Sequence, residues 1–411
     1  MFALAISIGI LSYILMGLGL VGWLNNTAIY LVLITWGLFL ILKIWSLIKN
    51  YKLSFDILRI LSLSNGKIKN SWLWILLAVQ MSVNFVGALG PELGFDALWY
   101  HLTIPKIWLM QHKITFLGGD LYYSGLPKLI DMLYVYPGAQ LIHFGFGILT
   151  LIVIYKLARK YLDEKYALLA CIIFYSNLVV GWQSITAYVD LGRTFFEIFA
   201  LYLFVNKKYF QTAVVLGLAI SSKILALGSL IIFLTLGLNP LYFLISLLIA
   251  SPWFIFNLIN TGNPVYPIFL GYQIDWNLSF NILRLADPIN PVYVMVLPLL
   301  ITPPFPPLRL RGGTEEGDIR TLVVYCILSF IVWFLTPHTG GGRFLMPYLP
   351  VWSVLTAILI QKNKFLVSMA IALAIISIGY RGLANSKYIP YLIGLQSKQE
   401  FRDIYLYHRF K

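Results

Sequence analysis

The chain has 411 residues, of which 60% are apolar and only 11% are charged, whereas about 25% of the residues in an ordinary soluble domain are charged. A water-soluble fold cannot bury that much apolar surface, which excludes a soluble enzyme, and an aromatic content of 16% excludes a disordered chain. The formal net charge of +14 is typical of a polytopic membrane protein with basic cytoplasmic loops, and we expect no nucleic-acid partner.

About thirteen apolar segments approach the roughly 20 residues that a membrane-spanning helix needs. They predict an all-α polytopic membrane protein with about 11–13 transmembrane helices. Segment 209–238 fits one kinked helix or two short ones, and no internal repeat is visible, which argues against a transporter built from repeated halves. The expected spans are 3–22, 27–48, 72–90, 138–158, 166–183, 188–205, 209–222, 224–238, 241–259, 290–304, 320–336, 344–361 and 365–380.

Lys and Arg residues indicate which loops are cytoplasmic. They cluster in alternate loops, so the opposite loops face outward, and two of these, 91–137 and 260–289, are long. We expect the N-terminus to face outward as well. The chain then divides into two N-terminal membrane helices with a basic cytoplasmic loop (1–71), a membrane core (72–380) and a basic tail (381–411) that does not fit the charge count.

The first long outer loop begins with acidic and aromatic residues in a helical pattern. Pro91 can start a helix, and the pattern predicts a short interfacial helix that ends at Pro105. Its spacing places Asp96 and Tyr100 on one face, with Glu92 one turn earlier. A carboxylate at the end of a membrane span can have a raised pKa and act as a general base, although acids that merely face water give the same pattern.

Charged residues within apolar spans are functional candidates by default. Asp190 begins an apolar helix with Arg193 as its expected local partner, and Glu197, one turn deeper, needs a partner or a protonated state. Lys223 interrupts an apolar stretch, where it either marks a helix break or snorkels to the interface. Arg343 follows three glycines, and it either grips a phosphate with two hydrogen bonds or anchors its helix at the interface.

Other polar residues give weaker signals. Lys128 and Asp131 lie later in the first outer loop and fit a solvated segment with aromatic anchors. The five histidines show no paired metal-ligand spacing, and no GxxxxGK[ST] phosphate-binding loop occurs. We therefore expect neither a metal nor a cofactor.

Several segments, taken in their order along the chain, resemble the GT-C superfamily of integral-membrane glycosyltransferases. The resemblance covers roughly residues 75–360, and its branch is that of the protein O-mannosyltransferases, the lipid A aminoarabinose transferase and the RgtA/B/C/D-like enzymes. Each segment is weak by itself, and the specificity lies in their joint order. The segments are 95–102 with Pro105 and Lys106, 123–127, 188–191, 217–223, 252–253 with 261–267, and 343–347.

The resemblance implies many membrane helices, interfacial helices in the first large outer loop, and an acid near the start of that loop, which Asp96 matches. It also implies a sugar donor on a polyprenyl phosphate, with inversion at the anomeric carbon on the outer face. Many members have a second acid directly after the first. Here position 97 is Ala, so Glu92 and Asp190 remain alternatives for the second acid.

The sequence thus predicts a multi-pass glycosyltransferase, of a prokaryotic cell membrane, acting on a lipid, glycan or protein acceptor. Asp96 would take the acceptor proton, and Arg343, Lys223 and Lys106 would stabilise the phosphate leaving group. We expect Tyr100, His101 and Tyr266 to contact substrate. The alternatives are a polytopic transporter and a lipid-linked glycan flippase or polymerase, because intramembrane charges can also line a translocation path.

Overall fold

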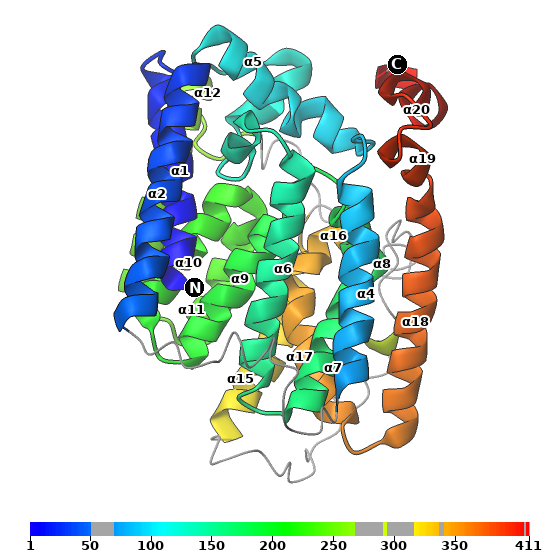
Figure 1. Cartoon of the computed structure of the whole chain (residues 1–411). Coiled ribbons are helices and arrows are strands. Elements are labelled where there is room, and N and C mark those ends of the chain that lie inside the picture. Colours follow the sequence, from blue (N-terminus) through cyan, green and yellow to red (C-terminus); the bar gives the residue numbers. More distant parts are fainter. Residues whose placement is uncertain (51–69, 268–290, 294–315, 337–340, 407, 411) are drawn as a thin grey trace.

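The computed structural model describes residues 1–50, 70–267, 291–293, 316–336, 341–406 and 408–410. Within these ranges the regular structure is entirely helical (Figure 1). The helices before the central bundle and in the first outer loop are α1 (Phe2–Leu20), α2 (Asn26–Asn50), α4 (Ser71–Ala88), η1 (Ala97–His101), α5 (Thr103–Gln111), η2 (Gly119–Gly125) and η3 (Asp131–Val135). Those that follow are α6 (Ala139–Ala158), α7 (Glu164–Tyr175), α8 (Leu178–Gln183), α9 (Asp190–Val205), α10 (Tyr209–Ser222), η4 (Ile224–Ala226), α11 (Leu227–Thr235), α12 (Pro240–Thr261), α15 (Glu316–Phe334), α16 (Gly342–Leu345), η6 (Met346–Tyr348), α17 (Leu349–Ile360), α18 (Lys364–Ser386), α19 (Ile389–Leu392), α20 (Lys398–Tyr405) and η7 (His408–Phe410).

Seven helical segments of the described part are long and apolar enough to cross a membrane. They confirm the prediction of an all-α, multi-pass integral membrane protein. Shorter apolar helices such as α10 and α15 add to the bundle. The predicted span 290–304 lies almost wholly outside the described residues, so the total number of spans stays a prediction. The seven segments are 2–20, 26–43, 71–88, 139–158, 240–261, 342–360 and 364–386.

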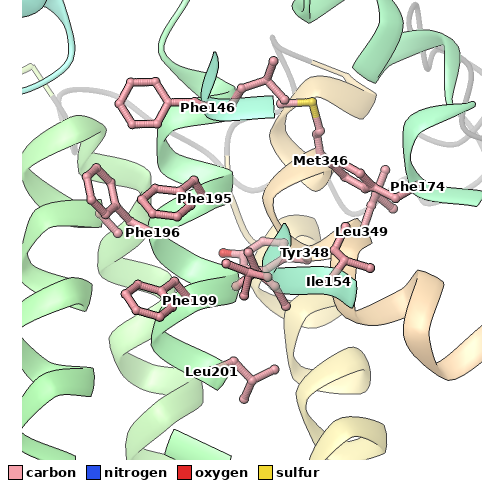
Figure 2. Close-up of a cluster of buried hydrophobic side chains, with 14 of the residues drawn as sticks. Phe146, Ile154, Phe174, Phe195, Phe196, Phe199, Leu201, Met346, Tyr348 and Leu349 are labelled. Atoms are coloured by element: carbon pink, nitrogen blue, oxygen red, sulfur yellow. The ribbon is translucent and has the colours of Figure 1, made fainter. Parts of the chain in front are cut away.

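Helix α9 forms the centre of the bundle, packed between α6 and α10. Nearly all of its side chains are buried. Figure 2 shows how its phenylalanines meet side chains from α6 and from the η6–α17 segment. Lipid tails are as apolar as these side chains, so close packing rather than the hydrophobic effect holds such helices together. The labelled core residues are Phe146, Ile154, Phe174, Phe195, Phe196, Phe199, Leu201, Met346, Tyr348 and Leu349.

Local capping residues determine where several helices begin. The side chain of Asp163 accepts a hydrogen bond from the Tyr166 amide at the start of α7. The side chain of Asn239 accepts a hydrogen bond from the Leu241 amide at the start of α12, where Pro240 occupies the first turn. Such caps satisfy amides that lack partners within the helix, and a proline is tolerated there because its missing N–H is not needed.

The N-terminus lies at the opposite end of α1 from the first outer loop, so the prediction that it faces the same side was wrong. At the far end of α1, the Leu24 amide donates to the His112 carbonyl in the outer loop, at 3.1 Å. The Met1 amino group instead lies near Lys156, at the last turn of α6. A single helix of 19 residues crosses the membrane once, which places its two ends on opposite sides.

Three helix boundaries differ from the predicted ones. The predicted interfacial helix does not end at Pro105, because this proline lies within the first turn of α5, where its missing N–H costs no hydrogen bond. The segment 166–183 is divided into α7 and α8 around Asn177. Helix α18 continues to Ser386, so the basic tail begins as part of that helix.

The C-terminal tail folds back onto the outer loop, and α19 and α20 lie at the same end of the bundle as α5 (Figure 1). Tyr388 and Phe401 form a small core with Ile185 and Leu93. Gly90 permits this docking, because a Cβ at this position would lie only 2.1 Å from the Tyr388 ring. Helix α20 begins with a reciprocal capping box between Ser397 and Glu400.

Candidate active site

Asp96 and Arg343 lie 247 residues apart in the sequence and form an ion pair at the outer-loop end of the bundle. The Arg343 Nη1 atom donates to Asp96 Oδ2 at 2.7 Å. Their side chains are 18% and 11% exposed, so both are partly shielded but remain accessible. Asp96 directly precedes the π-helical turn η1, and such turns often occur at functional sites.

A second ion pair adjoins the first. The Lys223 Nζ atom donates to Asp190 Oδ1 at 2.5 Å, and Asp190 Oδ2 lies 4.0 Å from Arg343 Nε. We call these residues the charge cluster: Asp96, Arg343, Asp190 and Lys223. Two carboxylates and two cations alternate in it, so each charge has an opposite neighbour in a low-dielectric environment.

Irregular backbone lies at Lys223 and just before Arg343. Lys223 adopts an extended conformation, with φ −158° and ψ 124°, between α10 and η4. Of the two interpretations of Lys223, the structure shows the helix break. Segment 209–238 therefore forms two short helices and not one kinked helix. Gly341, two residues before Arg343, has φ 52° and ψ −136°, a region that only glycine adopts readily.

Replacement of Gly341 by Ala is expected to lower any activity that depends on the position of Arg343 by up to about 100-fold, because a small displacement of a charged group that positions substrate can cost that much. The strain of a non-glycine residue at this φ would be relieved by moving Arg343. Gly379→Ala in α18 is the matched control, since a Cβ there meets no atom within 4 Å. Steady-state turnover and thermal unfolding of both variants test this. Equal turnover of the two would contradict it.

Aromatic rings surround the cations of the charge cluster. The Arg343 guanidinium lies over the rings of Tyr188 and Phe344, at 4.9 and 5.2 Å from their centroids. Lys223 Nζ lies 4.6 Å from the Phe344 centroid. The Tyr188 hydroxyl also accepts a hydrogen bond from the Asp96 amide at 3.1 Å. These rings restrict the cations without neutralising them.

A tight turn at 186–190 positions Asp190, and two side chains hold this turn. Glu92 Oε2 accepts from the Ala187 amide at 2.6 Å. His143 of α6 donates from Nδ1 to the Thr186 carbonyl at 2.7 Å and accepts the Leu191 amide on Nε2 at 2.9 Å. His143 had no predicted role, because a lone histidine in an apolar helix gives no local signal of the turn that it supports.

Glu92 connects the start of the outer loop to that turn. Its other oxygen, Oε1, accepts from the Leu93 and Gly94 amides at 2.9 and 2.6 Å. Burial raises the pKa of Glu92 to about 7, and the three backbone donors oppose the shift. A pKa near 7 suits a general base, but both oxygens already accept backbone hydrogen bonds, so the geometry favours a structural role.

The structure corrects the expected partner of Arg193. Its Nε atom donates to Glu197 Oε1 at 2.5 Å, and its Nη2 atom donates to the Tyr348 hydroxyl at 2.9 Å. Asp190 is instead paired with Lys223, from the break between α10 and η4. Helix geometry allows both the i,i+3 and the i,i+4 pair, and tertiary packing selects the second. Of the two possibilities for Glu197, a partner or a protonated state, the structure shows the partner.

His101 belongs to a second buried network beside the charge cluster. Its Nδ1 atom lies 2.6 Å from Asp131 Oδ1, and Lys128 Nζ lies 3.1 Å from Asp131 Oδ2. Lys128 and Asp131 are only 2% and 1% exposed, so the prediction of a solvated segment was wrong for them. Lys128 also lies 5.0 Å from the centroid of the Tyr100 ring, and Tyr100 lies beside Asp96. The network therefore supports the residue next to the proposed base.

Two predicted site residues lie apart from the charge cluster. Lys106 is exposed on α5. Tyr266 packs edge-on against Phe116, and its carbonyl accepts a hydrogen bond from Asn257. In the ranges that the structure describes, neither contacts a member of the charge cluster. Among those residues there is also no group of three or more His, Cys, Asp or Glu side chains placed to hold a metal ion.

No protein-family model and no curated protein matches the sequence. The fold, however, is similar to the crystal structure of ArnT from Cupriavidus metallidurans bound to undecaprenyl phosphate, with a TM-score of 0.54 and 15% identity, over 79% of this chain and 69% of that one. The apo form of the same enzyme is similar with a TM-score of 0.53 and 15% identity, over 72% of this chain and 60% of that one. For the apo form of the Archaeoglobus fulgidus oligosaccharyltransferase, the TM-score is 0.45 and the identity 16%, over 79% of this chain and 57% of that one.

The similarity to ArnT shows that the chain has a GT-C-like fold, as the resemblance in sequence predicted. At 15% identity this similarity concerns the fold alone. The chain spans 69% and 60% of the length of the two ArnT structures. The activity must therefore be argued from the charge cluster.

Proposed function

We propose that the protein is an inverting membrane glycosyltransferase that moves a sugar from a polyprenyl-phosphate donor to an acceptor hydroxyl. The observation that carries the proposal is the convergence of Asp96, Arg343, Asp190 and Lys223 at one end of a GT-C-like fold. The structure of ArnT with undecaprenyl phosphate supports a polyprenyl-phosphate donor.

The reaction needs one proton acceptor and one site for a leaving phosphate. The acceptor oxygen attacks the anomeric carbon from the face opposite the phosphate, forming a new C–O bond while the bond to the phosphate oxygen breaks. Asp96 takes the hydroxyl proton, and polyprenyl phosphate leaves as an anion. Arg343 and Lys223 stabilise the charge that develops on the phosphate.

Arg343 can serve the phosphate without releasing Asp96. A guanidinium has five N–H donors in a fixed fork, and the ion pair uses Nη1. Its Nε atom has no hydrogen-bond partner among the described residues. Asp190 is fully buried and bonded to Lys223, so we assign it as a positioning residue for the two cations, and Asp96 as the base.

A transporter or flippase is the alternative. The charges of a transporter should line a path that reaches both membrane faces, whereas the charge cluster joins residues from the outer loop, α9, α10–η4 and α16 at one place.

The decisive experiment incubates the purified protein with a panel of polyprenyl-phosphate sugars and measures released polyprenyl phosphate. Release that requires an acceptor and yields a product of inverted configuration supports the transferase. No release from any donor, with lipid-linked sugar crossing the bilayer of proteoliposomes, would favour the flippase.

We further predict that the charge cluster faces the non-cytoplasmic side. Lys113→Cys in the first outer loop and Pro264→Cys after α12 should react with a membrane-impermeant thiol reagent in intact cells. Lys362→Cys, in a basic loop between α17 and α18, should react only after permeabilisation. The two native cysteines are buried and give a low background. Labelling of positions 113 and 264 from opposite sides, or of both only from inside, would refute this orientation.

A further inference from the structure

A cavity of about 180 Å³ lies between the first outer loop and the C-terminal tail, outside the charge cluster. Its wall comes from the loop before η1, from α8 with the turn after it, and from the end of α18 with the tail. Drug-sized ligands occupy sites of roughly 300–1,000 Å³, so this cavity suits a smaller unit such as one sugar. The lining residues are Leu93, Gly94, Trp182, Ile185, Thr186, Arg381, Ala384, Asn385, Lys387, Tyr388 and Tyr405.

Among the described residues, two cations and no carboxylate line the cavity. Arg381 Nη2 donates to the Gly181 carbonyl at 3.1 Å and to Asn385 Oδ1 at 3.0 Å, both neutral acceptors. The Arg381 Nε atom is buried and has no partner among the described residues. Lys387 Nζ lies over the rings of Tyr388 and Tyr405, at 5.3 and 5.4 Å. A sheltered cation without a counter-ion is costly, and an anionic ligand would compensate both charges.

The rest of the lining favours a saccharide. The aromatic residues Trp182 and Tyr405 line the cavity, and Thr186 adds a hydroxyl. Tyr388 also belongs to the lining, but its ring is stacked on Phe401. A small number of polar groups among aromatic side chains is the usual composition of a site for a small organic molecule. A bare inorganic anion would use the two cations but not these rings.

The cavity lies one side chain away from the proposed catalytic pair. The Trp182 ring contacts the Tyr188 ring, with centroids 5.3 Å apart. Tyr188 also contacts the Arg343 guanidinium and the Asp96 amide. A ligand held against Trp182 is therefore close to Asp96 without occupying the positions assigned to the donor phosphate.

We propose that this cavity binds an anionic saccharide unit of the acceptor, one that carries a phosphate or a carboxylate, with Arg381 and Lys387 as its charge partners. The proposal rests on the proposed transferase function, to which it adds the class of acceptor. It also gives the tail a role, because Lys387, Tyr388 and Tyr405 complete the cavity.

Direct binding tests the proposal without turnover. Isothermal titration of the full chain in phosphatidylcholine nanodiscs would use glucose 6-phosphate, glucuronate, glucose and inorganic phosphate as probes. We expect glucose 6-phosphate or glucuronate to bind more tightly than both glucose and inorganic phosphate, and the better of the two identifies the anionic group. Arg381→Ala and Lys387→Gln should each weaken that binding by roughly 10-fold or more, as the loss of a charged hydrogen bond predicts.

Controls separate this site from general electrostatics and from misfolding. Lys398→Gln removes an exposed charge of α20 that does not line the cavity and should leave binding unchanged. Thermal unfolding checks each variant, and Lys387→Gln tests the site even if Arg381→Ala does not fold. The proposal would be overturned if glucose and the charged sugars bound with equal affinity, or if Lys387→Gln bound them as tightly as the wild type. Complete competition by phosphatidylglycerol would also overturn it, in favour of a lipid headgroup site. Donor turnover in the wild type tests the proposed function separately.

Discussion

Replacement of Asp96 by Asn is expected to reduce sugar transfer by about 10²–10⁴-fold, the usual contribution of a general base. Asn keeps the size of the side chain and can still accept a hydrogen bond from Arg343, but it cannot take the proton of the acceptor hydroxyl. Donor binding should persist, because Arg343 and Lys223 remain. The measurement is single-turnover transfer with saturating donor, together with donor affinity and thermal unfolding.

Asp120→Asn is the matched control for this experiment. Asp120 lies in the same outer loop, but its side chain is 91% exposed and forms a surface ion pair with Arg409 at 3.7 Å, the kind of pair that contributes little. Near-normal turnover of Asp96→Asn would show that Asp96 is not the base. Glu92, with its pKa raised to about 7 by burial, would then be the next candidate.

Replacement of Arg343 by Lys is expected to lower the rate of transfer by roughly 10–100-fold, which corresponds to the loss of one hydrogen bond to a charged group. Lys keeps the positive charge, but it cannot contact Asp96 and two phosphate oxygens in the planar geometry of a guanidinium. Arg343→Ala should lower the rate further, since it also leaves Asp96 without its partner. The effect should appear in kcat, because the phosphate charge develops in the transition state.

The simpler interpretation of Arg343, as an interfacial anchor, predicts a different result. An anchor extends its charged head into water, and Lys would then replace Arg without loss. The Arg343 side chain is instead only 11% exposed and bonded to Asp96. Arg320→Lys, at an exposed position of α15, is the control and should keep wild-type turnover. If Arg343→Lys kept wild-type turnover, Arg343 would be an interfacial anchor and not a phosphate-binding residue.

Much of the site could be found from the sequence because charged residues are rare within apolar segments. Asp190, Lys223 and Arg343 were predicted as candidates for that reason, and Asp96 because it lies in a helical pattern directly after a membrane span. The structure brings all four together. Lys106 and Tyr266 were included because they belong to segments of the resemblance, and the structure places them elsewhere. Membership of a similar segment does not determine the direction of a side chain.

The sequence by itself determined that this is a helical membrane protein, since apolar segments of sufficient length have few other stable forms in a bilayer. It also determined which residues are candidates for chemistry. Only the tertiary structure decided the partners: Asp96 with Arg343 across 247 residues, Asp190 with Lys223 rather than Arg193, and the tail with the outer loop. Helical periodicity describes neighbours within about one turn, whereas a charge in a low-dielectric bundle pairs with whichever opposite charge the packing of distant helices brings within reach.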